Sequence, residues 1–131
     1  MPITTALYAG LLGLLAFGVA FPAGRLRARL NVSVGDGGNP DLLCAMRRHA
    51  NFVEWVPLAL ILIALLELNG ASATVIHVLG AVLVASRIAH ATGLRTDTMK
   101  SVPRFIGATG TVLVILVASI WLILMYIRHP V

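Results

Sequence analysis

The sequence contains very little charge. Asp, Glu, Lys and Arg make up 11% of its 131 residues, against about 25% in an ordinary soluble domain, while 59% of the residues are hydrophobic. This composition excludes a soluble globular protein and a disordered chain. Residues 1–24, 68–86 and 105–127 contain no charged side chain at all. Each stretch is close to the roughly 20 residues that a membrane-spanning helix needs.

Cysteine and N-terminal positive charge are also scarce. Cys44 is the only cysteine, which excludes an intrachain disulfide and the spacing of zinc or iron–sulfur ligands. No metal site is predicted, because no pair of histidines or carboxylates has ligand spacing on one face together with a third partner. No Lys or Arg precedes Arg25, so the first apolar stretch lacks the basic start of a cleaved signal peptide. We expect it to be a retained helix.

The remaining span, which is the second along the chain, is less obvious because its first half is polar. It contains Arg47, Arg48, Asn51 and Glu54. Asn39 is predicted to cap this helix, with Pro40 as its first residue. We therefore predict an all-α membrane protein, with helices at about 3–28, 40–68, 72–93 and 102–128 forming one four-helix bundle domain over residues 1–131. Gly93 is predicted to end the third helix.

The basic residues predict the orientation in the membrane. If the connections alternate between sides, nine of the ten basic residues fall on the side of the first and third connections, and only Arg128 falls opposite. By the positive-inside rule these connections are cytoplasmic and both termini lie outside, in a bacterial inner membrane. Anionic lipid headgroups or an anionic substrate are compatible with the net charge of +5. Nucleic acid is not expected as a partner, because the basic residues lie at helix ends beside hydrocarbon.

Small residues predict close helix packing. They recur four apart in the first helix, at Ala6/Gly10 and Ala9/Gly13, and the last helix contains Gly107 and Gly110. Such residues let helix backbones approach in lipid. The pattern favours ordinary packing within the bundle over a specific oligomer contact.

Three polar residues share one stripe of the second helix. Arg47, Asn51 and Glu54 are spaced i, i+4, i+7, which directs a cation, an amide and a carboxylate the same way. Glu54 is predicted to lie roughly 8 Å inside the hydrocarbon edge, on a rise of about 1.5 Å per residue. Ionisable residues at such depth mark a functional site by default. The alternative is a structural network that neutralises itself.

Further polar residues belong to the same side of the membrane. Arg87 and His90 share a face of the third helix at i, i+3, and Arg104 opens the fourth helix after Pro103. For His90 the alternative is a helix-end histidine in the headgroup region. Arginines bind carboxylates bidentately, Glu54 can receive an ammonium group, and Asn51 can pair with a peptide group. These groups suit a small zwitterionic peptide with two carboxylates.

A thiol on such a peptide would be activated by the cations. A nearby arginine lowers the pKa of a thiol from its usual value of roughly 8.5 and so raises the fraction of nucleophilic thiolate. A lipophilic cosubstrate would then arrive from the membrane.

Segment 47–57, RRHANFVEWVP, resembles the signature of the MAPEG family, membrane-associated proteins in eicosanoid and glutathione metabolism. The RxxxNxxE core is matched fully. Residues 87–90, RIAH, resemble the third-helix RxxH motif of the family, and Pro103-Arg104 resembles the start of its last helix. The turn at residues 34–38 is similar to that of bacterial members. The likeness extends over nearly the whole chain.

This resemblance implies a homotrimer with glutathione bound between neighbouring subunits, in a site open to the cytoplasm and the membrane. Arg104 would be the catalytic residue that stabilises the thiolate. The residues expected to bind glutathione are Arg47, Asn51, Glu54, Arg87, His90 and Arg25. The implied activity is that of a glutathione transferase or peroxidase, with glutathione as cosubstrate and a lipophilic electrophile or lipid hydroperoxide as the second substrate.

One departure from the family concerns the end of the third helix. Leu94 stands where the eicosanoid-forming members have a tyrosine that contacts glutathione, and leucine cannot supply a hydroxyl. This disfavours a specialised eicosanoid synthase, and it is compatible with weaker glutathione binding or with a different thiol. Trp55 stands where many members have tyrosine and retains only a donor nitrogen.

Two other functions are compatible with four short spans. A non-catalytic lipid-binding or scaffold protein would share the bundle but would not need Arg104. A proton-coupled small multidrug exporter would also contain a membrane glutamate. The surplus of arginines disfavours the exporter, because a site for lipophilic cations should be net negative.

Overall fold

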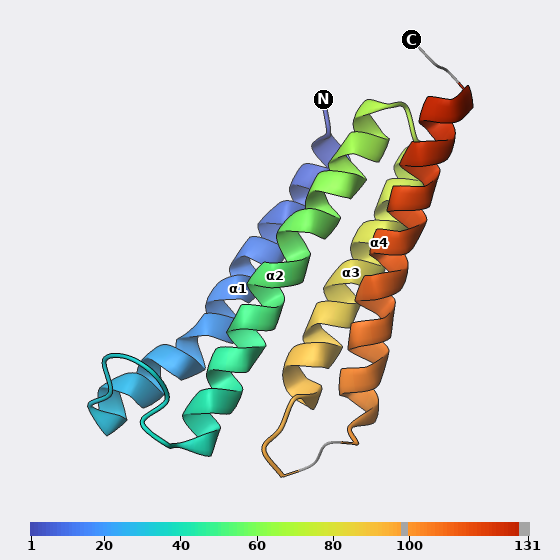
Figure 1. Ribbon diagram of the computed structural model, residues 1–131. Helices are drawn as coiled ribbons and strands as arrows, with labels where there is room; N and C mark the ends of the chain where they lie inside the picture. The colour runs from blue at the N-terminus through green and yellow to red at the C-terminus, as the bar shows by residue number, and fades with distance from the viewer. Residues whose placement is uncertain (98–99, 129–131) are drawn as a thin grey trace.

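The computed structural model describes residues 1–97 and 100–128 and consists of four long helices (Figure 1). They are α1 (Ile3–Leu30), α2 (Pro40–Leu68), α3 (Ala73–Gly93) and α4 (Val102–Arg128). All four are long and apolar enough to cross a membrane. The predicted all-α four-helix membrane bundle is therefore confirmed. Residues 98–99 and 129–131 of the predicted domain lie outside the described part.

The helices run up and down as two hairpins, α1 with α2 and α3 with α4 (Figure 1). The packing is most extensive within each hairpin, and α2 also contacts both α3 and α4. Within the described residues, α1 and α4 do not touch. The longer connections, between α1 and α2 and between α3 and α4, lie at one end of the bundle, and the α2–α3 turn lies at the other (Figure 1). The end with the two longer connections is the one that carries nine of the ten basic residues.

Local sequence explains where the helices begin and end. The side chain of Asn39 accepts a hydrogen bond from the Leu42 N–H at 3.0 Å, which confirms the predicted cap of α2. The first helix continues two residues past its predicted end, to Leu30, and stops where Asn31 adopts a left-handed conformation with φ of 53°. Gly70 has a φ of +87° and turns the chain sharply between α2 and α3.

The core lies between the helices and is almost wholly aliphatic. It joins side chains from all four helices, namely Leu12, Val19, Phe52, Val56, Ala59, Ile63, Leu66, Ile76, Leu79, Leu83, Val114 and Ala118. In lipid, burial of such groups gives little net driving force between helices, so close fit and polar contacts must hold the bundle together.

Glycines provide that close fit in the second hairpin. A Cβ built on Gly107 would lie 2.4 Å from the backbone nitrogen of His90, and one on Gly93 would lie 2.2 Å from the backbone nitrogen of Arg104. The predicted packing role of Gly107 is therefore confirmed. Gly93 is the last residue of α3, as predicted, but its φ is not positive, and its missing side chain serves this close approach instead.

The glycines of α1 behave differently. A Cβ added to Gly10 or Gly13 would meet nothing within 4 Å. The expectation that these small residues pack against other helices of the same chain is therefore wrong for the glycines of α1. The spacing of small residues indicates that another helix can approach α1 closely, but it does not identify that helix.

Polar contacts close the end of the bundle opposite the basic residues. Glu67 of α2 accepts hydrogen bonds from the Thr4 and Thr5 N–H groups at the start of α1. The hydroxyl of Tyr8 in α1 lies 3.0 Å from Nδ1 of His77 in α3. These contacts tie α1 to both neighbouring helices.

Candidate functional site

The predicted site is organised around a buried hydrogen bond between α2 and α3. Nη2 of Arg87 donates to Oδ1 of Asn51 at 2.9 Å. Arg87 is only 2% exposed, and its guanidinium carbon lies 6.0 Å from the centre of the Phe52 ring. Its Nε atom has no acceptor among the described residues. A guanidinium with an unused donor at membrane depth suits an anionic or carbonyl group of a ligand.

One cavity is lined by both residues of this contact, and a second cavity shares one lining residue with the first. One of about 70 Å³ is lined by side chains of α2, α3 and α4, namely Asn51, Trp55, Arg87, Ala108, Thr111 and Val112. The other, of about 490 Å³, is lined by Lys100, Ser101, Val102, Arg104, Phe105 and Ala108. Ala108 belongs to both linings, so the cavity of the predicted catalytic arginine and the cavity of the Asn51–Arg87 pair have one lining residue in common.

The third and fourth helices hold His90 and Arg104 close together. His90 is buried, and it lies within electrostatic range of both Arg87 and Arg104. Gly107 packs on the backbone of His90, and Gly93 packs on the backbone of Arg104. The half-buried Arg104 lies in the first turn of α4. The structure thus brings together four of the predicted site residues, Asn51, Arg87, His90 and Arg104.

The side chains of the other three predicted site residues are exposed in the isolated chain. Arg47 and Glu54 lie on α2 on either side of Asn51 in sequence, and Arg25 lies near the end of α1. Among the described residues, none of the three has a hydrogen-bond or ion-pair partner. An unpaired carboxylate facing lipid is costly, so Glu54 requires a cover of protein, ligand or water.

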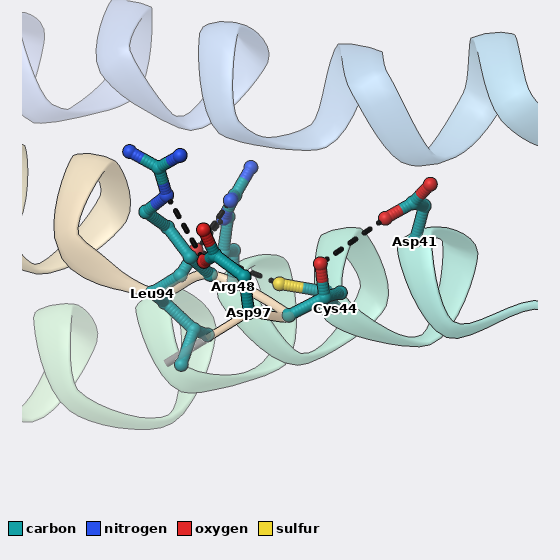
Figure 2. A network of polar contacts seen from close by, with 7 residues as sticks. Asp41, Cys44, Arg48, Leu94 and Asp97 are labelled. Carbon is teal, nitrogen blue, oxygen red and sulfur yellow. Dashed lines mark hydrogen bonds and ion pairs between the residues drawn. The ribbon is translucent and has the colours of Figure 1, made fainter. Parts of the chain in front are cut away.

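A residue that sequence reasoning left out of the site is Arg48. Its Nε donates to the Leu94 carbonyl at 2.7 Å, its Nη2 donates to the same oxygen, and the Cys44 thiol approaches that oxygen at 3.5 Å (Figure 2). Arg47 and Arg48 are adjacent in sequence, and successive residues point about 100° apart around a helix. Arg47 is exposed, whereas Arg48 is half-buried. The sequence signal was the charge itself, which needs a partner in an apolar helix.

Comparison with known proteins identifies the family. The MAPEG family matches residues 5–124 of the chain. The chain belongs to the MAPEG family. This MAPEG protein is similar to the inner membrane protein YecN of Escherichia coli strain K12, with 37% identity over 120 residues that cover 91% of this chain and 92% of that protein. The protein of the same name from Escherichia coli O6:H1 matches with the same identity and coverage.

Family membership and the four apolar helices together establish an integral, multi-pass membrane protein. The family match covers nearly the whole chain, so it applies to all four helices. The MAPEG family includes glutathione transferases and members without catalytic activity.

Proposed function

We propose that this MAPEG protein is a membrane-bound, glutathione-dependent transferase or peroxidase. The observation that supports this most directly is that two cavities share the lining residue Ala108, one lined by Arg104 and the other by Asn51 and Arg87. Peptide-binding groups and a thiolate-stabilising cation would then act on one bound molecule. The second substrate would be a lipophilic electrophile or a lipid hydroperoxide.

The donor set matches the charges of glutathione. Arg47 and Arg87 would bind its two carboxylates, Glu54 would accept its ammonium group, and Asn51 would pair with a peptide bond. The free Nε donor of Arg87 supports this assignment, since it has no acceptor among the described residues. Arg25 and His90 are proposed as further contacts with glutathione.

The chemistry would depend on Arg104. A guanidinium beside the thiol lowers the pKa of the thiol and stabilises the thiolate. In transfer, the thiolate sulfur bonds to an electrophilic carbon, and the displaced electron pair is taken up by a leaving group or an adjacent electron-withdrawing group. In peroxide reduction, two glutathione molecules are oxidised to the disulfide while the hydroperoxide is reduced to an alcohol and water. Exposed apolar side chains beside Arg104, such as Phe105 and Val102, suit a substrate that arrives from lipid.

A homotrimer would complete this site. The described lining of the larger cavity comes entirely from residues 100–108, so a second subunit would supply its opposite wall. The unpartnered Arg47 and Glu54 would also be covered by a neighbour and its glutathione. The open glycines of α1 would let a helix of another subunit approach.

We infer the orientation from charge. The end with nine of the ten basic residues would face the cytoplasm, with both termini outside, in a bacterial inner membrane. The similar Escherichia coli protein is named an inner membrane protein, which supports that membrane. Membrane lipids would surround the bundle.

Titration of the purified protein with glutathione in detergent at neutral pH tests the proposal, with Arg104→Ala measured in parallel. A saturable ultraviolet absorbance of thiolate, lost in the variant, is expected. If the folded wild-type protein gives no such signal, the proposal is rejected in favour of a different thiol or a non-catalytic lipid-binding or scaffold role. Leu94 would explain such a negative result, because it stands in place of the tyrosine of eicosanoid-forming members and has no hydroxyl to contact glutathione.

A further inference from the structure

We propose that Arg48 is a positioning residue that fixes Arg104 by holding the carbonyl end of α3. This inference rests on the proposed function, because it concerns the arginine assigned to the thiolate. It adds a residue outside the signature positions Arg47, Asn51 and Glu54.

The contact of Arg48 with α3 is specific. Two N–H groups of its guanidinium, Nε and Nη2, donate to one oxygen, the carbonyl of Leu94 (Figure 2). Leu94 is the residue that caps the C-terminus of α3, and its own N–H donates to the His90 carbonyl. The C-terminal end of a helix is negative, so a cation is favoured there. Arg48 thus fixes the last turn of α3 against α2.

The C-terminal end of α3 packs directly against the backbone of Arg104. Gly93, next to Leu94, lies so close to α4 that an added Cβ would be 2.2 Å from the Arg104 nitrogen and 2.8 Å from the carbonyl carbon of Pro103. This is a contact between backbones, which cannot relax by rotation of a side chain. A shift of Leu94 and Gly93 therefore moves the first turn of α4, and Arg104 with it.

Other contacts of this segment are weaker. The hydroxyl of Thr96 lies 3.4 Å from the Asp41 carboxylate, and the Arg95–Asp97 ion pair is well exposed. Exposed ion pairs contribute little stability. Arg48 thus donates the shortest of the hydrogen bonds described between α2 and residues 94–97, since those of Cys44 and Thr96 measure 3.5 and 3.4 Å.

Arg48 lines neither of the two cavities on which the proposed site rests. The two cavities that it lines, each of about 290 Å³, share no lining residue with the cavities of Arg104 and Arg87. Its effect on the reaction must therefore pass through α3. This predicts a change in turnover without a matching change in glutathione affinity.

Arg48→Met tests this prediction, with Arg29→Met as the matched control. Arg29 is an exposed arginine at the same end of the bundle and has no partner among the described residues. We expect Arg48→Met to lower kcat and the thiolate signal by about 10- to 100-fold, because small displacements of a catalytic group are costly. The glutathione Kd should change less than about twofold, and Arg29→Met should change neither quantity. Arg48→Lys should restore part of the loss, because an ammonium group can donate to the same carbonyl.

Hydrogen exchange of the amides in residues 94–108 gives a readout that is independent of activity. The Phe105 N–H donates to the Ser101 carbonyl in the first turn of α4, and its exchange should become about tenfold faster in Arg48→Met but not in Arg29→Met. If the wild-type protein shows no thiolate, the proposed function fails, and this exchange still decides whether Arg48 fixes the start of α4. If Arg48→Met does not fold, Arg48→Lys is compared with the wild-type protein in the same way.

Unchanged turnover and unchanged exchange in a folded Arg48 variant would overturn the proposal. Equal losses of glutathione affinity and turnover would overturn it too, because they would make Arg48 a direct ligand of glutathione.

Discussion

Glu67 in α2 caps the first turn of α1 through Thr5. One oxygen of the carboxylate accepts hydrogen bonds from the Thr5 N–H at 2.7 Å and from the Thr5 hydroxyl at 2.6 Å, and the other accepts from the Thr4 N–H at 2.8 Å. The capping residue of α1 is thus supplied from the far end of the next helix, since the preceding Pro2 makes no side-chain cap.

Glu67→Ala should lower the stability of the bundle by about 1–2 kcal/mol, the usual cost of losing a helix cap. Glu67→Gln should lower it less, because an amide oxygen still accepts one of these hydrogen bonds. The measurement is the shift of the unfolding curve in a denaturing detergent. A wild-type curve for Glu67→Ala would show that the cap adds nothing to stability.

Glycine substitutions should rank by what the new methyl group meets. Gly107→Ala should cost about 3 kcal/mol, because its Cβ would lie 2.4 Å from backbone atoms of His90 and Ser86. Gly110→Ala should cost less, since the nearest atom is the rotatable Ser86 hydroxyl, and Gly10→Ala should cost nothing within the chain. Unfolding curves of the three variants test the order. Equal losses at Gly107 and Gly10 would contradict the packing described for α3 and α4.

The Asn51–Arg87 contact should matter for both stability and binding. Asn51→Leu leaves a buried guanidinium without this acceptor and should cost about 1.5–3 kcal/mol. Asn51→Asp keeps an acceptor and should preserve the fold, but its added negative charge should weaken binding of the anionic glutathione. Unfolding and glutathione titration of both variants separate the two effects. Tight glutathione binding by Asn51→Asp would argue that Asn51 lies outside the ligand site.

Glu54 and Arg104 should affect different kinetic constants. Glu54→Ala should raise the glutathione Kd by about tenfold or more with a smaller change in kcat, because it removes a charged contact to the ligand. Arg104→Ala should lower kcat by about 10²-fold or more and raise Kd less, because its effect is on the thiolate and the transition state. Steady-state kinetics and direct titration measure both constants. Unchanged affinity in Glu54→Ala would remove Glu54 from the site, and equal losses in Arg104→Ala would make it a simple binding residue.

The four spans could be predicted from the sequence because hydropathy and charge act locally. A run of apolar residues identifies three of the spans, and the start of the other is marked by the cap at Asn39, which depends only on its neighbours. The i, i+4, i+7 spacing likewise put Arg47, Asn51 and Glu54 on one stripe of a helix. None of these inferences requires knowledge of how one helix is rotated against another.

The contacts between helices could not be predicted, because they depend on how each helix is rotated against its neighbours. The partner of Asn51 is Arg87, and the residue that reaches Leu94 is Arg48 and not Arg47, because of how α2 is turned toward α3. The rotation of α2 about its axis is set by the combined packing of several helices, which no single motif encodes. Glu67 was missed for a similar reason, since its donors lie in a different helix.

The two-hairpin arrangement also bears on how the chain enters the bilayer. In the orientation proposed above, each hairpin crosses as a unit and its connection stays at the basic end. The ends that cross carry one Asp, Glu, Lys or Arg side chain apiece, Glu67 in the first hairpin and Arg128 in the second. The donors to Glu67 belong to α1, in its own hairpin. The carboxylate can therefore be translocated with its hydrogen bonds already formed, which lowers the cost of carrying that charge through hydrocarbon.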